Sequence, residues 1–76
     1  MSYIDQDYEL LLTFAQDWVW EDDLKHAIRR ETMRTSHQVT KFLKSLVYLR
    51  ELEFENQCYR LTPLGKMFAF AYLATS

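Results

Sequence analysis

Glycine and proline are almost absent from this chain, and their scarcity limits how it can fold more than any other feature. The 76 residues include one glycine, Gly65, and one proline, Pro63. Both residue types interrupt helices, so a chain with so few of them is predicted to be mostly helical. Hydrophobic residues make up 49% of the chain, which is far more than a disordered segment carries. We therefore expect one small folded domain over residues 1–76.

Helical spacing of apolar residues predicts a helix at each end of the chain. The first runs from about Asp5, which can cap it, to Gln16. The last spans residues 63–75, with Thr62 as its cap and Pro63 at its first position. The residues expected to face the core from the first helix are Ile4, Tyr8, Leu11, Leu12 and Ala15, and those from the last helix are Leu64, Met67, Phe68 and Ala71.

Both terminal helices also carry apolar residues that lie off these faces, namely Leu10, Phe14, Phe70 and Leu73. These residues exceed what one small core needs, and domains of this size are commonly stabilised by association. We expect the four residues to form a homodimer interface. A denser core around Trp18 and Trp20 is the alternative interpretation.

The middle of the chain is predicted to form a helix-turn-helix over residues 22–50. The tripeptide at residues 18–20 is aromatic and β-branched, and it is too short for a helix, so it predicts a short strand. A second helix follows, capped within a run of three acids and ending near Thr32. A turn of three residues then leads to a third helix over residues 36–50.

The third helix has the clearest division into two faces. Thr35 or Ser36 can cap it. Its apolar face is made by Val39, Phe42, Leu43, Leu46 and Leu49. Its opposite face is made by His37, Lys41, Lys44 and Tyr48. No acidic residue occurs from Thr32 through Arg50, so this helix is expected to attract anions.

A β-hairpin is predicted to follow, as a wing over residues 52–62. Apolar and polar residues alternate in Leu52–Glu55 and again in Cys58–Leu61, with Asn56-Gln57 between them. Alternation with a period of two on both sides of a short turn is typical of paired strands. The turn is not the favoured Asn-Gly, so a slightly longer loop stays possible at this point.

The order of these elements is α-β-α-α-β-β-α, which makes the predicted fold mainly α with a small β-hairpin, in the α+β class. A helix-turn-helix followed by a hairpin is the winged helix-turn-helix arrangement. Its third helix is narrow enough to enter the major groove of DNA, where each base pair presents a distinct pattern of donors and acceptors. We therefore expect residues 36–50 to be a recognition helix.

Five residues of this helix are expected to contact DNA. Lys41 and Lys44 suit phosphates or guanine edges. His37 and Gln38 lie where recognition helices usually touch bases, and an amide side chain can pair with adenine. Ser36 and the first backbone N–H groups can hold a phosphate at the helix N-terminus.

Three further residues complete the predicted DNA-binding set. Arg34, in the turn before the third helix, is expected to contact a phosphate. Tyr48 is expected to contact DNA or to pack against the hairpin. Arg60 is the only base in the hairpin, which also carries Glu53 and Glu55. We therefore expect the tip of the wing to hold phosphate only weakly.

The net charge of −2 hides an uneven distribution of charge. Residues 1–24 contain seven acids and no Lys or Arg, whereas residues 25–50 contain seven bases and one acid. Residues 51–76 contain three acids and two bases. A basic middle segment is typical of a protein that binds a polyanion. The alternative is that the acidic third pairs with the basic third inside one small fold.

The stretch from Ser36 to Gly65 resembles winged-helix transcription regulators of the PadR and MarR kind. Residues 59–66, Tyr-Arg-Leu-Thr-Pro-Leu-Gly-Lys, match the recurrent Tyr-x-Leu-Thr-x-x-Gly ending of their wing. The resemblance extends over residues 22–66 and is looser elsewhere. It implies a homodimeric regulator that binds an operator and dimerises through its terminal helices.

Other kinds of chemistry have little support in the sequence. His26, His37 and Cys58 do not stand at a metal-binding spacing, and nothing groups a nucleophile with a base, so neither a metal, a cofactor nor an enzymatic activity is expected. A single cysteine favours a reducing cytoplasm. No apolar run approaches the roughly 20 residues of a membrane span.

The expected function is that of a sequence-specific transcriptional regulator, with double-stranded DNA and a second copy of the chain as partners. The alternative is a winged-helix protein-interaction module that binds a regulator or a nuclease and has no strong affinity for DNA. The acidic first third of the chain and the acidic wing motivate this alternative.

Overall fold

A computed structural model describes residues 3–75 of the chain, and describes side chains for residues 6–74. Within these residues the chain is mainly helical, with a small antiparallel sheet, and the predicted α+β class and element order are confirmed. In chain order the elements are α1 (Tyr3–Phe14), β1 (Val19–Trp20), α2 (Glu21–Thr32), α3 (Ser36–Tyr48), β2 (Leu52–Glu55), β3 (Cys58–Leu61) and α4 (Pro63–Thr75).

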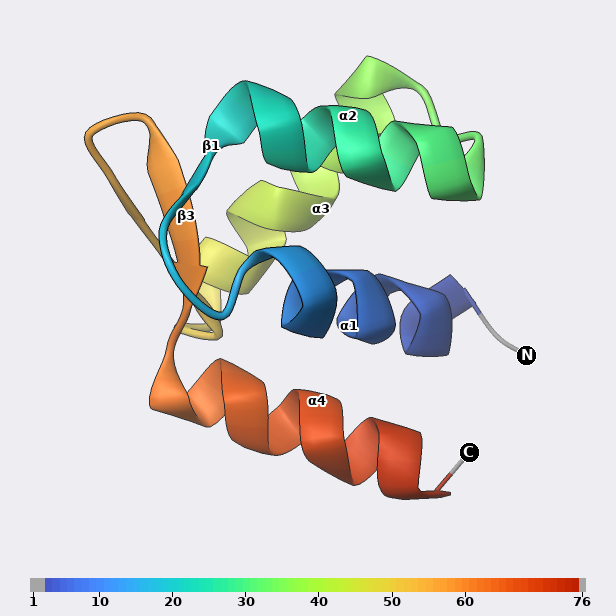
Figure 1. Ribbon diagram of the computed structural model, residues 1–76, viewed down its shortest axis with the longest axis vertical. Coiled ribbons are helices and arrows are strands. Elements are labelled where there is room, and N and C mark those ends of the chain that lie inside the picture. Colours follow the sequence, from blue (N-terminus) through green and yellow to red (C-terminus); the bar gives the residue numbers. More distant parts are fainter. Residues whose placement is uncertain (1–2, 76) are drawn as a thin grey trace.

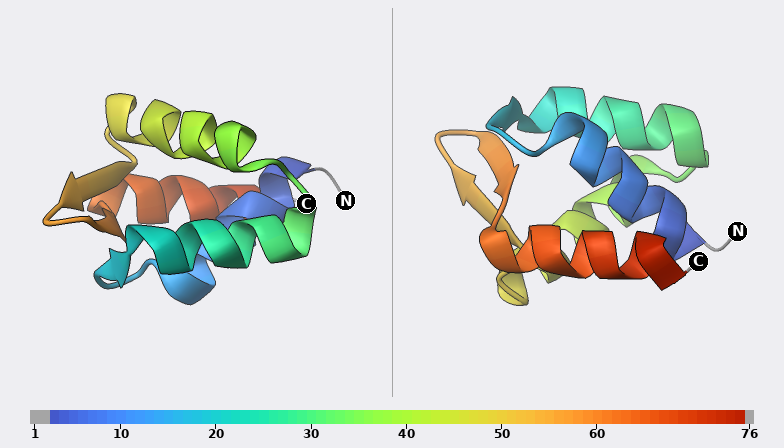
Figure 2. Two further views of the ribbon diagram at one scale, coloured as in Figure 1. Left: turned by 90° about the horizontal axis from the view of Figure 1, so that it is seen from above. Right: turned by 60° about the horizontal axis from the view of Figure 1, so that its bottom comes forward.

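The sheet lies at one end of the molecule and the helices extend away from it (Figures 1 and 2). Its strand order is β1-β3-β2, with antiparallel pairing throughout, so the second strand of the hairpin is central. Helix α1 packs against both α2 and α4, and α2 packs against α3. Seen from above, α2 and α3 run along opposite sides of the molecule (Figure 2).

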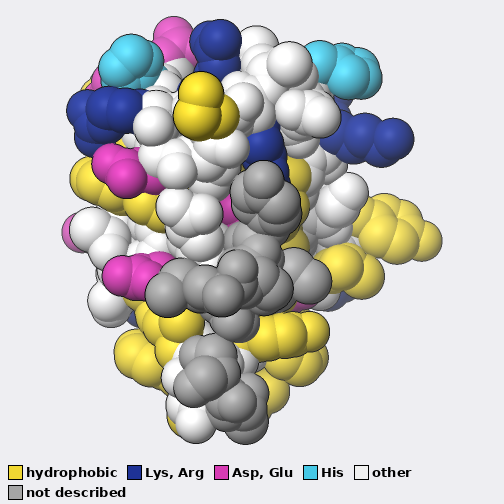
Figure 3. All heavy atoms as spheres, turned by 90° about the vertical axis from the view of Figure 1, so that its right-hand side faces the viewer, with side chains coloured by type: hydrophobic (Ala, Val, Ile, Leu, Met, Phe, Trp, Pro, Cys, Tyr) yellow, Lys and Arg dark blue, Asp and Glu magenta, His cyan; other side chains and the backbone are white. Residues whose placement is uncertain are grey.

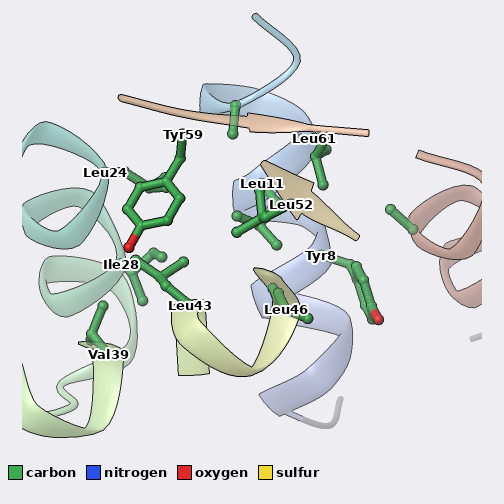
Figure 4. Packing of buried hydrophobic residues seen from close by; sticks show 12 residues of the cluster. Tyr8, Leu11, Leu24, Ile28, Val39, Leu43, Leu46, Leu52, Tyr59 and Leu61 are labelled. Atoms are coloured by element: carbon green, nitrogen blue, oxygen red, sulfur yellow. The ribbon is translucent and has the colours of Figure 1, made fainter. Parts of the chain in front are cut away.

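The core fills the space between the sheet and the helices (Figure 4). Every helix and both strands of the hairpin contribute to it. Its largest fully buried apolar side chains are Leu11, Leu24, Ile28, Val39, Leu43, Leu52 and Leu61. Complete burial of one such side chain stabilises the fold by about 1.5–3 kcal/mol. This shared core holds α3 against the rest of the molecule.

The hairpin turn has two residues, so the longer loop is not needed. Asn56 and Gln57 both have positive φ, at 51° and 63°, as in the type I′ turns that match the twist of a hairpin. Glu53 pairs with Arg60, and Glu55 pairs with Cys58. Tyr59 points into the core, and burial raises its pKa to about 12, beside the Glu21 carboxylate.

The ends of three helices differ from the sequence prediction. Helix α2 begins at Glu21, so the acidic run expected to cap it lies in its first turn, and the cap position is Trp20, which makes no side-chain cap hydrogen bond. Helix α1 begins and ends two residues earlier than predicted, so Asp5 lies inside the helix; the side chains of Ile4 and Asp5 are outside the described ones. Helix α3 ends at Tyr48, and Leu49 is 56% exposed where a core position was expected. The chain turns away there because Arg50 takes a left-handed conformation, with φ at 64°.

The predicted inner face of α4 is wrong. Leu64, Met67, Phe68 and Ala71 are all exposed. The buried positions are Gly65 and Ala69, and Tyr72 stacks on Tyr8 of α1 with ring centroids 5.0 Å apart.

A close approach of backbones explains why α4 turns its smallest residues inward. A Cβ atom at Gly65 would overlap the backbone carbonyl of Glu51. The side chain of Thr62 accepts a hydrogen bond from the Gly65 N–H at 3.0 Å and donates one to the Arg50 carbonyl at 2.6 Å. The Thr-x-x-Gly segment therefore caps α4 and lets it lie directly against the end of the hairpin.

Candidate nucleic-acid interface

Helix α3 presents its polar side chains outward because its apolar side is anchored in the core. Val39, Leu43 and Leu46 are buried. The predicted outward residues His37, Lys41, Lys44 and Tyr48 are all exposed. They line a shallow hollow of about 570 Å³ along the helix, together with Thr40, Ser45 and Leu49. Tyr48 is 87% exposed, so it does not pack against the hairpin.

The two lysines of α3 have no counter-ion, a property that they share with Arg29, Arg50 and Lys66 among the described side chains. Among the described side chains, neither Lys41 nor Lys44 has a carboxylate within 4.0 Å. Lys25 and Arg34, by contrast, pair with acids of the first third of the chain. Pairing of the acidic third with the basic third therefore accounts for these two bases but not for the lysines of α3.

Arg34 is tied into the fold. Its guanidinium lies 2.8 Å from the carboxylate of Asp7, which is 2% exposed, and its carbon lies 5.4 Å from the centre of the Phe42 ring. Burial raises the pKa of Asp7 above its ordinary value, and the Arg34 guanidinium offsets part of that rise. Arg34 thus joins α1 to the turn before α3, which makes it less available to a phosphate than its place in the sequence predicts.

Gln38 is held by the helix cap. The Thr35 side chain accepts a hydrogen bond from the Gln38 N–H at 3.2 Å, and the Gln38 side-chain oxygen accepts one from the Thr35 N–H at 2.9 Å. Thr35 is therefore the cap, and Ser36 is the exposed first residue of α3. Bidentate pairing with adenine needs both the oxygen and the nitrogen of the side-chain amide. Gln38 therefore has to leave the cap in order to contact a base in this way.

Arg60 is engaged by other residues of the fold. Two nitrogens of its guanidinium contact one carboxylate oxygen of Glu53, at 2.7 Å and 2.6 Å. Its carbon lies 4.3 Å from the centre of the Trp18 ring. The wing was predicted to hold phosphate only weakly. In addition, its one base is neutralised by Glu53 and stacked on Trp18.

Sequence reasoning missed a second basic surface on α2. His26, Arg29, Arg30 and Met33 line a hollow of about 530 Å³ with Arg34. Their helical spacing was the available signal. Arg34 also lines a hollow with Gln38, Lys41 and Ser45. The basic residues of α2 and α3 therefore border one another, and Figure 3 shows Lys, Arg and His side chains gathered in the upper part of the molecule.

The chain matches no protein-family model, and no curated protein or solved structure is significantly similar to it. Its function is therefore inferred from the chemistry of its surfaces. No helix within residues 3–75 combines the length and the apolar character needed to cross a membrane. Within the same residues, no three His, Cys, Asp or Glu side chains gather in a way that could hold a metal ion.

Proposed function

We propose that this chain is a winged-helix transcriptional regulator that binds double-stranded DNA with α3 in the major groove. The observation that carries the proposal is the stripe on α3, where Lys41 and Lys44 stand exposed and without counter-ions on a helix that has no acid. Unpaired cations on one exposed face release counter-ions from DNA when they bind phosphates, and this release drives association.

The arrangement of elements agrees with this role. An α-helix fits the width of the major groove, and α3 is joined by a short turn to α2 and is followed directly by the hairpin. His37 stands at the second position of α3, where recognition helices contact bases. We assign Lys41 and Lys44 to phosphates or guanine edges, and Tyr48 to the sugar-phosphate backbone at the far end of the helix.

Arg34, Gln38 and Arg60 have smaller roles in this proposal than in the sequence prediction, because each already has a partner within the fold. Arg29 of α2 takes their place as a candidate phosphate contact, since it is exposed beside the turn and has no ion pair among the described side chains, whereas the neighbouring Arg30 lies 3.7 Å from the Glu31 carboxylate. Phosphate contacts of this kind position a protein on DNA without reading its sequence.

We also propose that the protein acts as a homodimer through α4. Met67 and Phe70 are each 57% exposed on a helix whose only charged residue is Lys66, and Phe14 of α1 is exposed as well. Figure 3 shows hydrophobic side chains gathered in the lower part of the molecule. Leu10 packs against the core, and Leu73 is half-buried, so they contribute less than predicted. Trp18 and Trp20 are exposed, and a denser core around them does not account for these residues.

Binding to a random duplex at several salt concentrations tests the DNA-binding surface. We expect Lys41→Ala with Lys44→Ala to weaken binding by roughly ten-fold or more at low salt. The slope of log affinity against log salt should fall by about 1.8, since each phosphate contact contributes about 0.9. The matched control is Lys25→Ala with Lys66→Ala, which removes the same charge from α2 and α4 and should change binding much less.

Equal losses in the two double variants would show that only net charge matters and would reject the α3 surface. Absence of any binding by the unaltered protein, even at low salt, would reject DNA binding altogether. That result would favour the alternative function, a module that binds another protein.

A further inference from the structure

The outer face of the sheet carries two parallel rows of side chains. Residues that pair directly across antiparallel strands share a face, so Trp20, Cys58 and Glu55 form one row across β1, β3 and β2. Arg60 and Glu53 pair in the next row along, and Trp18, just before β1, completes it by stacking on Arg60. Tyr59 and Leu61 point to the opposite face and are buried.

The second row shows how this face holds a guanidinium. The Arg60 side chain is half-buried between the Trp18 ring, 4.3 Å away, and the Glu53 carboxylate, 2.6 Å away. An indole face attracts a cation, and a carboxylate accepts hydrogen bonds from the same group. The row is therefore a complete indole–guanidinium–carboxylate arrangement.

The first row has the same two flanks but lacks the cation. Its central position is Cys58, a small neutral residue, while its flanks are the indole of Trp20 and the carboxylate of Glu55. Trp20 is 61% exposed, and Glu55 is exposed with no ion-pair partner within the described side chains. A hollow of about 230 Å³ lies over Cys58; the indole that lines it is that of Trp18, together with Glu55, Asn56 and Cys58, while Trp20 lies beside Cys58 in the strand register but does not line the hollow. This volume is several times the roughly 30 Å³ that one water molecule occupies.

The surroundings of this hollow are acidic. Asp22 and Asp23 come two and three residues after Trp20, in the first turn of α2; both are exposed and make no ion pair among the described residues. Asp17, on the other side of β1, is exposed as well. Lys25 is engaged with Glu21 at 3.5 Å, and Arg60 is engaged with Glu53. The face thus repels phosphates and attracts cations.

We infer that this face docks an arginine side chain from a basic segment of a partner protein, placed over Cys58 between the Trp18 indole and Glu55, with Trp20 beside it. An arginine suits the site better than a lysine, because a planar guanidinium can stack on an indole and meet a carboxylate at the same time. The surface lies apart from the lysines of α3, so this inference goes beyond DNA binding and does not depend on it.

The chain has two tryptophans, both on this face, so their indole N–H resonances report on it directly. The probe is an acetylated Gly-Arg-Gly-Arg-Gly amide, titrated against the protein and followed by NMR. Its matched control peptide has citrulline, a neutral isostere, in place of each arginine. We expect saturable shifts of both indole resonances with the arginine peptide and binding about ten-fold weaker with the citrulline peptide.

Three variants locate the arginine. Cys58→Arg fills the first row from within and should abolish binding of the peptide, whereas Cys58→Ser should not. Glu55→Gln should weaken binding several-fold, whereas Glu9→Gln, which alters an exposed carboxylate on α1, should leave it unchanged. If Cys58→Arg does not fold, Trp20→Ala takes its place, because Trp20 is exposed and its loss spares the core.

Equal binding of the two peptides, or shifts that leave the indole resonances unmoved, would overturn the inference. Indole shifts that depend on protein concentration alone, and that disappear with Lys41→Ala and Lys44→Ala, would mean that α3 of a second copy occupies the face. That result would also overturn the inference. Failure of the peptide to bind a protein that still binds DNA separates this inference from the proposed function.

Discussion

Helices α3 and α4 have the same length of 13 residues and pack against the same core, but they bury opposite kinds of side chain. Helix α3 buries large side chains, such as Leu43, and exposes polar ones. Helix α4 buries Gly65 and Ala69 and exposes Met67 and Phe70.

The difference separates two ways of placing a helix. In α3 the apolar stripe alone decides which side turns inward, because burying it removes the most apolar surface from water. In α4 nearly every side is apolar, so a close approach of backbones decides instead. The outer surfaces that remain are also different: one is basic and suits DNA, and the other is apolar and suits a second protein chain.

The largest expected effect tests the inner side of α3. Leu43→Ala should lower the free energy of unfolding by about 3 kcal/mol, because it leaves a cavity in the centre of the core. Lys44→Ala, one residue along on the exposed side, should change it by less than about 0.5 kcal/mol. Urea denaturation measures both, and similar losses in the two variants would refute the assignment of inner and outer faces.

Gly65→Ala tests the backbone contact of α4. Overpacking against the Glu51 carbonyl should cost about 3 kcal/mol, and the better helix propensity of alanine should return about 1 kcal/mol, so the net loss of stability is about 2 kcal/mol. Lys66→Ala, at the next position, is the control. A variant as stable as the unaltered protein would mean that α4 can move away from Glu51 at little cost.

Phe70→Glu tests the outer side of α4. A carboxylate at the centre of a dimer interface should weaken the dimer by at least roughly ten-fold without disturbing the core, since Phe70 is exposed in one copy. Light scattering and sedimentation measure the change. Met33→Glu, which places the same charge at the most exposed apolar residue near α3, should leave the dimer intact. A monomeric unaltered protein at tens of micromolar would contradict the dimer.

The smallest effect concerns the ion pair before α3. Burial raises the pKa of Asp7, so the folded state holds this proton more tightly than the unfolded state. The stability that this carboxyl contributes is present at low pH and is lost as the pH rises through the raised pKa.

Asp7→Asn does not titrate, so its stability relative to the unaltered protein should improve between pH 3 and pH 7. Urea denaturation at both values measures the difference, with Glu9→Gln as the exposed-carboxylate control. A relative stability that worsens with pH would mean that the pairing with Arg34 outweighs the burial of the charge.

Much of the fold was predictable because its signals are local. The alternation in Leu52–Glu55 and Cys58–Leu61 predicted both strands of the hairpin, and the stripe of α3 predicted its faces. The exposed positions of Lys41 and Lys44 followed from the same periodicity. These features depend on residues only a few positions apart, which periodicity can detect.

Apart from the helix ends, the errors concern contacts between distant residues. Arg34 was assigned to phosphate because its partner Asp7 lies 27 positions away in the sequence. The inner face of α4 was misjudged because no periodicity exists in a helix that is apolar on nearly all sides. The hollow over Cys58 was not foreseen either, since it depends on the register of three strands.

The sequence by itself determined the order of the elements, the two faces of α3 and the absence of acids along it. Tertiary structure decided which cations remain without partners and which side of α4 stays exposed. The physical reason is that spacing along one element sets a pattern of side chains, whereas ion pairs and backbone approaches arise between elements. The stripe on α3 keeps its two cations unpaired, whereas Arg34 and Arg60, which the sequence presents as equally available, are neutralised within the fold.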